Sequence, residues 1–162
     1  MQIQNEAQLI MSFFAADHDR LDVLFSEFMR LKHEDFPGAK LYFKDFLRGL
    51  KRHIVWEEDV LFPLFENKTG NIGSGPTFVM RQEHRLIGEA LERLHGKVRL
   101  ADADCDTQAG ELKALLGEHN SKEENILYPM LDRLIQPEEA AAAFHAMENI
   151  PAERYNTCCG AH

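Results

Sequence analysis

The sequence of 162 residues predicts an all-α fold: an up-down-up-down antiparallel four-helix bundle with a short extra C-terminal helix and a loose tail. Two observations lead to this prediction. Four stretches of about 25–30 residues carry apolar side chains at helical spacing, and no stretch alternates with the period of a strand. Short breaks separate these stretches, and short connections favour antiparallel neighbours in a bundle.

Turn signals bound each predicted helix. The breaks lie at residues 33–38, 70–76 and 102–107, and the second is the clearest because it contains three Gly and one Pro. Pro137, followed by two Glu, predicts the start of the short extra helix, since Pro and acidic residues suit the first turn. The helical pattern is lost after Pro151. We therefore expect one domain over residues 1–150 and a tail over residues 151–162.

The composition excludes several classes of function. Lys and Arg number 18 against 27 Asp and Glu, which gives a net charge of −9, whereas nucleic-acid binding needs clustered basic residues. No apolar run approaches the ~18 residues of a membrane-spanning helix, and the first residues lack a signal-peptide pattern. Three Cys are too few for a disulfide framework. We expect a cytoplasmic protein with no nucleic-acid partner and no membrane partner.

An internal repeat organises the polar residues. A segment of the form His-x3-Glu-Glu-x2-Leu-aromatic-Pro begins at His53 and recurs at His119, 66 positions later. The same offset relates His18 to His84, which lie on the first and third predicted helices. One His-x3-Glu pair would arise by chance in a chain with eight His, but two in a shared frame are strong evidence. The chain therefore contains two copies of a helix pair, each with one His and one His-x3-Glu.

These repeated residues are predicted to converge inside the bundle. Residues four apart share a helix face, and similar distances to the adjoining breaks bring all the groups to one level. Buried imidazoles and carboxylates are costly unless paired or bound to metal, and this mixture suits two first-row transition ions with bridging carboxylates. A metal-free polar layer is the alternative. The candidate metal ligands are His18, His53, Glu57, His84, His119 and Glu123.

Over residues 8–135 this pattern resembles the hemerythrin-like (HHE cation-binding) family, whose ligand positions the six candidates match one by one. The segment Met80-x2-Glu83-His84 and the two Leu-aromatic-Pro endings are also similar to the family. The resemblance implies a four-helix bundle with two iron ions in a non-haem di-iron centre, bridged by the two Glu and an oxo or hydroxo group. It also implies binding of O2 or NO, sensing of oxygen or iron, or repair of damaged iron centres.

The ligand set departs from that of the oxygen-carrying hemerythrins. Those proteins use a fifth His, four residues from the one on the third helix, where this chain has Met80 and Gly88. Four His and two Glu are closer to the iron-centre repair proteins, which usually carry an extra N-terminal cysteine-bearing domain that we do not expect here. A ferritin-like centre needs two Glu-x-x-His motifs, and only Glu92-x-x-His95 fits.

Three classes of function remain open. The first is a module that binds or senses O2 or NO. The second is a di-iron redox protein or iron donor in repair of iron centres, and the third is a domain with a structural metal. We rank binding or sensing first, and an enzyme second, because the sequence reveals no general acid, nucleophile or substrate pocket.

Several residues near the candidate ligands keep two interpretations. The carboxylates of Asp17, Glu58, Glu83 and Glu124 either orient imidazoles or lie as solvated charges. Tyr128 is expected to pack in the core. The vicinal pair Cys158-Cys159 either binds a soft metal or has no role, and the sequence favours the second interpretation.

Overall fold

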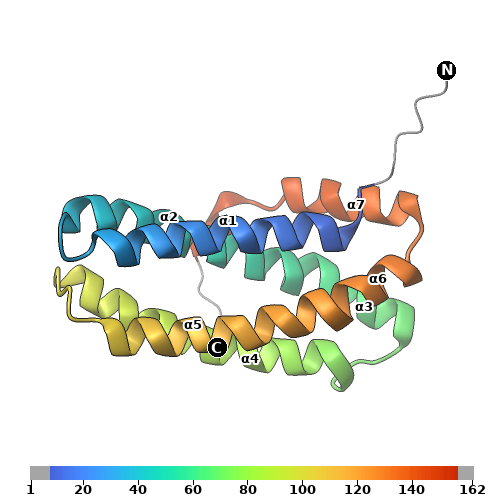
Figure 1. The fold of residues 1–162 in the computed structure, drawn as a ribbon. Coiled ribbons are helices and arrows are strands. Elements are labelled where there is room, and N and C mark those ends of the chain that lie inside the picture. The colour runs from blue at the N-terminus through green and yellow to red at the C-terminus, as the bar shows by residue number, and fades with distance from the viewer. Residues whose placement is uncertain (1–7, 157–162) are drawn as a thin grey trace.

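The computed structural model describes residues 8–156, in which every regular element is helical (Figure 1). This confirms the predicted all-α class. No helix within the described range is long and apolar enough to cross a membrane. The elements are α1 (Ile10–Leu31), α2 (Phe36–Trp56), the π-helix η1 (Glu57–Leu61), α3 (Phe62–Thr69), α4 (Gly75–Arg99), α5 (Asp106–Lys122), the π-helix η2 (Glu123–Leu127), α6 (Tyr128–Leu134), α7 (Pro137–Glu148) and the 3-10 helix η3 (Ala152–Asn156).

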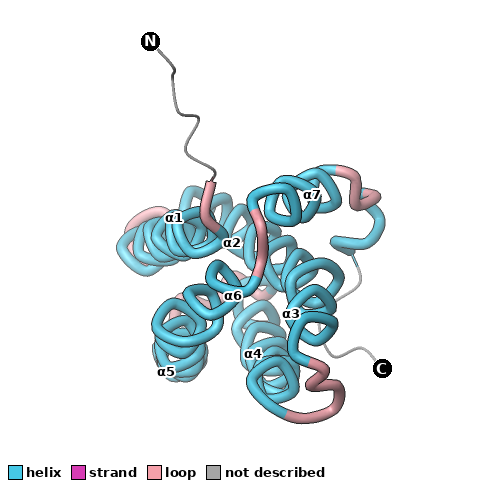
Figure 2. The backbone as a smooth tube through the Cα atoms, turned by 90° about the vertical axis from the view of Figure 1, so that its right-hand side faces the viewer, coloured by secondary structure: helices cyan, strands magenta, loops and turns pink. Residues whose placement is uncertain are grey.

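Two rods of the bundle consist of three helical elements in direct succession, α2–η1–α3 and α5–η2–α6. α1 packs along α2 and also contacts α6, while α4 packs along α5. Viewed end-on in Figure 2, α7 lies outside these rods. At Gly49 of α2 an added Cβ would lie 2.6 Å from a methyl carbon of Leu21, so Gly permits the close approach of α1.

Local chemistry accounts for the turns between the rods. Before α2, the Asp35 side chain accepts a hydrogen bond of 3.1 Å from the backbone N–H of Gly38. α3 ends at Gly70, whose φ of 74° lies in the left-handed region that Gly adopts without strain. The buried Lys32 after α1 donates to the carbonyl of Ala103 at 2.7 Å and pairs with Asp106, also at 2.7 Å. That lysine ties the α1–α2 turn to the α4–α5 turn.

Each π-helix begins at a Glu and leads into a Pro. The backbone N–H of Phe62 donates to the carbonyl of Glu57, five residues earlier, and the second rod repeats this pattern between Tyr128 and Glu123. A Pro follows at the next position of each rod. The helical path continues past each Pro, because the wider π turn avoids the clash between a Pro ring and the carbonyl four residues earlier.

The apolar core is divided into two clusters by a layer of buried polar side chains. One cluster lies near the α1–α2 and α4–α5 turns and includes Phe28 and Leu94, both fully buried. The other lies toward α3, α6 and α7 and includes Phe14 and Leu131. Each fully buried apolar side chain stabilises the fold by about 1.5–3 kcal/mol, so packing on both sides holds the rods in place around the polar layer.

The start of the tail is ordered, which corrects the expectation of a loose segment from residue 151. Trp56 Nε1 donates to the hydroxyl of Tyr155 in η3 at 3.0 Å, and Arg154 forms two hydrogen bonds with Asp59 at 2.8 and 2.9 Å. The expectation was wrong here because these contacts join residues about 100 positions apart, which no local pattern reveals. The Cys158-Cys159 pair lies outside the described residues, and the domain limits stay a prediction.

The two core clusters predict a contrast between two leucines of α4. Leu91→Ala should lower the free energy of unfolding by about 2–5 kcal/mol, because Leu91 is fully buried and its loss leaves a cavity. Leu86→Ala should change it by less than ~1 kcal/mol, since Leu86 is 50% exposed. Urea unfolding followed by circular dichroism measures both values, and equal losses would contradict the described packing of α4.

Candidate metal centre

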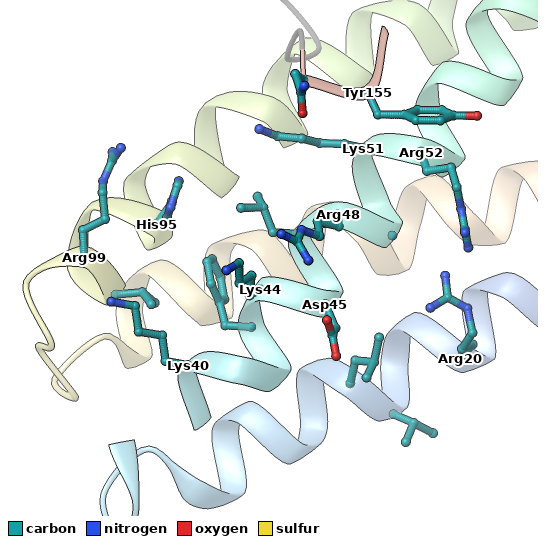
Figure 3. Close-up of a pocket in the computed structure, with 17 residues that line it drawn as sticks. Arg20, Lys40, Lys44, Asp45, Arg48, Lys51, Arg52, His95, Arg99 and Tyr155 are labelled. Atoms are coloured by element: carbon teal, nitrogen blue, oxygen red, sulfur yellow. The ribbon is translucent and has the colours of Figure 1, made fainter. Parts of the chain in front are cut away.

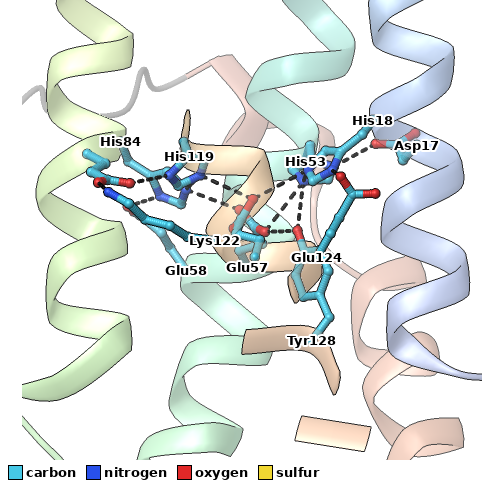
Figure 4. Close-up of polar contacts among 12 residues, drawn as sticks. Asp17, His18, His53, Glu57, Glu58, His84, His119, Lys122, Glu124 and Tyr128 are labelled. Carbon is cyan, nitrogen blue, oxygen red and sulfur yellow. Dashed lines mark hydrogen bonds and ion pairs between the residues drawn. The ribbon is translucent and has the colours of Figure 1, made fainter. Parts of the chain in front are cut away.

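The polar layer contains all six candidate ligands that the sequence predicts (Figure 4). His18 and His84 lie in the middle of α1 and α4, and His53 and His119 lie in the last turns of α2 and α5, while Glu57 and Glu123 are the first residues of η1 and η2. Each of the six is less than 5% exposed. The structure therefore brings the predicted set together, and π turns of this kind are frequent at functional sites.

The four imidazoles form two pairs. Nε2 of His18 lies 3.1 Å from Nε2 of His53, and Nε2 of His84 lies 3.1 Å from Nε2 of His119. Two nitrogens bound at a right angle to one ion, each at about 2.1 Å, are about 3.0 Å apart. The spacing within each pair is therefore that of two ligands of a single ion.

The two carboxylates lie between these pairs. Glu57 places Oε1 3.4 Å from Nε2 of His53 and Oε2 3.1 Å from Nε2 of His84. Glu123 lies similarly. Its Oε1 is 3.2 Å from Nε2 of His119 and 3.4 Å from Nε2 of His18. Each carboxylate thus contacts both pairs, which is the arrangement of a bridging ligand.

A second set of carboxylates faces the outer nitrogen of each imidazole. An ionised carboxylate only accepts hydrogen bonds, so an imidazole bonded to one carries a proton on Nδ1 and points Nε2 inward. Three contacts are hydrogen bonds and the fourth is a longer approach. The distances from Nδ1 are 2.8 Å for His53 with Asp17, 2.9 Å for His84 with Glu58, 3.0 Å for His119 with Glu83 and 3.6 Å for His18 with Glu124.

Three of the four inner carboxylate oxygens of the layer lack a hydrogen-bond donor. Oε2 of Glu57 and both oxygens of Glu123 are buried and accept no hydrogen bond from the described residues, although imidazole nitrogens lie nearby. Facing lone pairs also repel within each imidazole pair unless a proton or cation lies between them. A buried polar atom left unpaired costs about 1–3 kcal/mol. A layer of imidazole and carboxylate donors with these orphaned atoms fits first-row transition metal ions.

The pKa values of the layer also indicate that the buried carboxylates require positive charge beside them. Burial alone would lower the pKa of His53, but the charge of Glu57 and the hydrogen bond to Asp17 outweigh it and raise the pKa to about 10. The pKa of His84 is raised to about 9 against the same penalty by Glu57 and Glu58. Burial opposes ionisation of Glu57, yet the neighbouring imidazoles hold its pKa well below the usual value. Protons or metal ions must supply this charge.

Comparison with known proteins is consistent with this geometry. Residues 9–131 match the sequence model described as the hemerythrin HHE cation binding domain. The chain belongs to the hemerythrin HHE family. The matched residues run from α1 into α6 and include every candidate ligand of the polar layer.

Two relatives illustrate the similarity of this HHE chain to curated proteins. The iron-sulfur cluster repair protein YtfE of Yersinia pseudotuberculosis serotype O:1b is 32% identical over 120 residues, which cover 66% of this chain and 54% of the relative. The protein of the same name from Yersinia pestis (strain Pestoides F) is 31% identical with the same coverage. The chain spans about half the length of the curated relatives it matches. No solved structure matches it.

The HHE layer is asymmetric at one position of the repeat. Tyr128 donates a hydrogen bond from its hydroxyl to Glu57 and lies 3.3 Å from Nε2 of His53. Its repeat counterpart Phe62 stacks on His84, with ring centroids 5.5 Å apart. Burial and the neighbouring carboxylates raise the pKa of Tyr128, so its hydroxyl keeps its proton. We expected only core packing for Tyr128, and the Phe-to-Tyr difference between the two copies is the signal that identifies it.

A cavity borders the HHE layer on one side. It has a volume of about 630 Å³ and is lined by residues of α1, α2, α5 and η2, including His18, Asp19, Asp22 and Glu124. His18 belongs both to this lining and to the first imidazole pair. The cavity therefore adjoins the layer on the side of that pair.

The outer carboxylates predict a selective effect on metal affinity. Glu58→Ala removes the acceptor for Nδ1 of His84 and should weaken metal binding about 10–100-fold, because the imidazole loses its orientation and basicity. Glu118→Ala changes an exposed carboxylate of α5 and serves as the control. Competition with a chromophoric chelator measures both affinities. Equal affinity in the two variants would contradict an orienting role for Glu58.

The raised pKa values predict proton release on metal binding. In the metal-free protein His53 and His84 are protonated at pH 7, since their pKa values are about 10 and 9, and a metal ion must displace those protons. Metal affinity should therefore rise with pH from 7 toward 10, and proton release should shrink over the same range. Anaerobic titration with Fe2+ in weakly buffered solution measures the release. Uptake without any release at pH 7 would contradict this charge balance.

Proposed function

We propose that this chain is a non-haem di-iron protein whose centre binds a small diatomic ligand, O2 or NO. The observation that supports the proposal most strongly is the inward-facing set of four imidazole Nε2 atoms and two buried carboxylates. The family description, a cation-binding domain, agrees with it. In this proposal α1, α2–η1–α3, α4 and α5–η2–α6 form the up-down-up-down bundle.

Two iron ions would each take one pair of imidazoles. His18 and His53 would hold one ion and His84 and His119 the other, with Glu123, which belongs to both candidate ligand groups, and Glu57, which lies near both pairs, available to each. Six protein ligands divided between two ions leave coordination positions free for a small molecule. When bound, iron would supply a redox-active Lewis acid suited to a small ligand such as O2 or NO.

The chain's own residues prepare this layer for a small ligand. Asp17, Glu58 and Glu83 fix three imidazoles through Nδ1, so that Nε2 cannot rotate away. Phe14 packs edge-on against His53 at 5.1 Å between centroids and helps to exclude water from the layer. The hydroxyl of Tyr128 donates to Glu57 and thereby orients that carboxylate.

A second candidate function is redox chemistry or iron donation in the repair of iron centres. The names of the relatives favour it, since they are iron-sulfur cluster repair proteins at 31–32% identity. The chain covers 54% of their length, so the proposal concerns the part that aligns. A third candidate is a structural domain in which an ion such as Zn2+ joins the helices. These candidates differ in turnover and in spectral response.

The proposed function predicts a response to gas. The iron-loaded chain, prepared without oxygen, should change its visible spectrum saturably on addition of NO or O2, because open positions on iron accept the ligand. The zinc-loaded chain is the control and should remain silent.

The outcomes separate the candidates. If neither NO nor O2 changes the spectrum of the iron-loaded chain, ligand binding is contradicted. The structural metal domain would then be the favoured candidate. Consumption of NO over many turnovers with a reductant, or transfer of iron to a metal-free iron-sulfur protein, would favour the second candidate.

A further inference from the structure

A basic groove lies along the outer face of α2, outside the metal layer (Figure 3). Its volume is about 1010 Å³, and α1, the end of α4 and η3 complete its walls. Seven of its lining residues are Lys or Arg and one is Asp, although the chain has only 18 Lys and Arg and a net charge of −9. The groove therefore concentrates positive charge on an otherwise acidic protein.

Four of these cations form a row along α2. Lys40, Lys44, Arg48 and Arg52 are each four residues apart, a spacing at which like charges face one another and destabilise a helix. Within the described part of the chain, no carboxylate lies within ion-pair distance of the first three. The fold leaves this repulsion in place, and a bound group of opposite charge would relieve it.

The floor of the groove is apolar. Val23, Leu24 and Leu47 line it beside the row, and Val23 is 62% exposed. A ligand with negative charge alone would match the row and leave these side chains in water. The lining as a whole fits a ligand that is acidic on one side and apolar on the other.

We propose that this groove docks an acidic, amphipathic helix of a partner protein. From Lys40 to Arg52 the row rises about 18 Å along α2, in three steps of about 6 Å. A helix with Asp or Glu at every fourth position presents carboxylates at the same step, and its neighbouring apolar positions cover the floor.

The charge and shape of the groove select this occupant over other anions. A nucleic acid would meet the cations and leave the apolar floor uncovered. A membrane presents a flat surface, whereas α1, α2, the end of α4 and η3 line this groove together.

The groove ends beside the metal layer. Arg20 and Arg52 place their Nη2 atoms 3.0 and 3.9 Å from one oxygen of Asp17, and the other oxygen of Asp17 lies 2.8 Å from Nδ1 of His53. None of the six candidate metal ligands lines the groove. Substitutions at Lys44 and Arg48, away from Asp17, therefore test docking without changing the metal layer.

The only Trp of the chain reports on this groove. The guanidinium carbon of Arg52 lies 4.6 Å from the centroid of the Trp56 ring, and Trp56 Nε1 donates to Tyr155. Arg52 and Tyr155 both line the groove. An occupant that contacts them should change the fluorescence of Trp56.

The test uses the full chain and a labelled synthetic peptide that forms an amphipathic helix, with Glu at every fourth position and Leu beside it. Fluorescence anisotropy measures binding, and a peptide of the same composition in scrambled order is the first control. A single-stranded oligonucleotide and vesicles of anionic phospholipid are the competing probes. We expect the helical peptide to bind at least tenfold more tightly than the scrambled one and to shift the emission of Trp56.

Charge reversal locates the site. The double substitution Lys44→Glu with Arg48→Glu should weaken peptide binding at least tenfold, and its unfolding midpoint should equal or exceed that of the wild type because the repulsive row is broken. Arg85→Glu with Arg133→Glu makes the same change in net charge at exposed residues outside the groove and should leave binding intact.

Three results would overturn the proposal. The first is equal binding of the helical and scrambled peptides, and the second is peptide binding that survives the reversal at Lys44 and Arg48. The third is preference for the oligonucleotide or the vesicles over the peptide, which would assign the groove to a different partner.

Discussion

The burial of four imidazoles and two carboxylates at one level of a helical bundle is the constraint on which the rest of this structure depends. Such groups are costly to remove from water unless positive charge and aligned donors compensate them. Two apolar clusters, above and below the layer, supply the packing that holds it together. The raised pKa values of His53 and His84 and the orphaned oxygens of Glu123 are consequences of that one constraint.

The two copies of the repeat complete the layer only together. Asp17 orients His53 within the first copy, whereas Glu58 of the first copy orients His84 of the second. Both bridging carboxylates stand at the start of a π-helix, where the extra residue in the turn precedes a Pro. The same π turn, used twice 66 residues apart, makes the centre nearly symmetric, and Tyr128 adds a hydroxyl donor in one half only.

The sequence was sufficient to predict the helical class, the breaks and the six residues of the layer, because helical period and repeat offset determine which groups share a level. It could not distinguish orienting carboxylates from solvated ones, since the contact of Glu83 with His119 depends on rotamers in the packed bundle. It also missed the hydrogen bond between Trp56 and Tyr155, which joins distant segments. The basic row on α2 was also missed, because the net charge of −9 sums over the whole chain and does not show where the charges lie on the surface.

The number of metal ions bound by each chain tests the central claim most directly. Mass spectrometry of protein purified from iron-replete cells, or loaded anaerobically with Fe2+, should find two iron ions per chain. The double variant His84→Ala with His119→Ala removes one imidazole pair and should bind no more than one. A folded wild-type chain that binds less than one metal ion under both conditions would contradict the account, because the charge of the layer would then be balanced by protons alone.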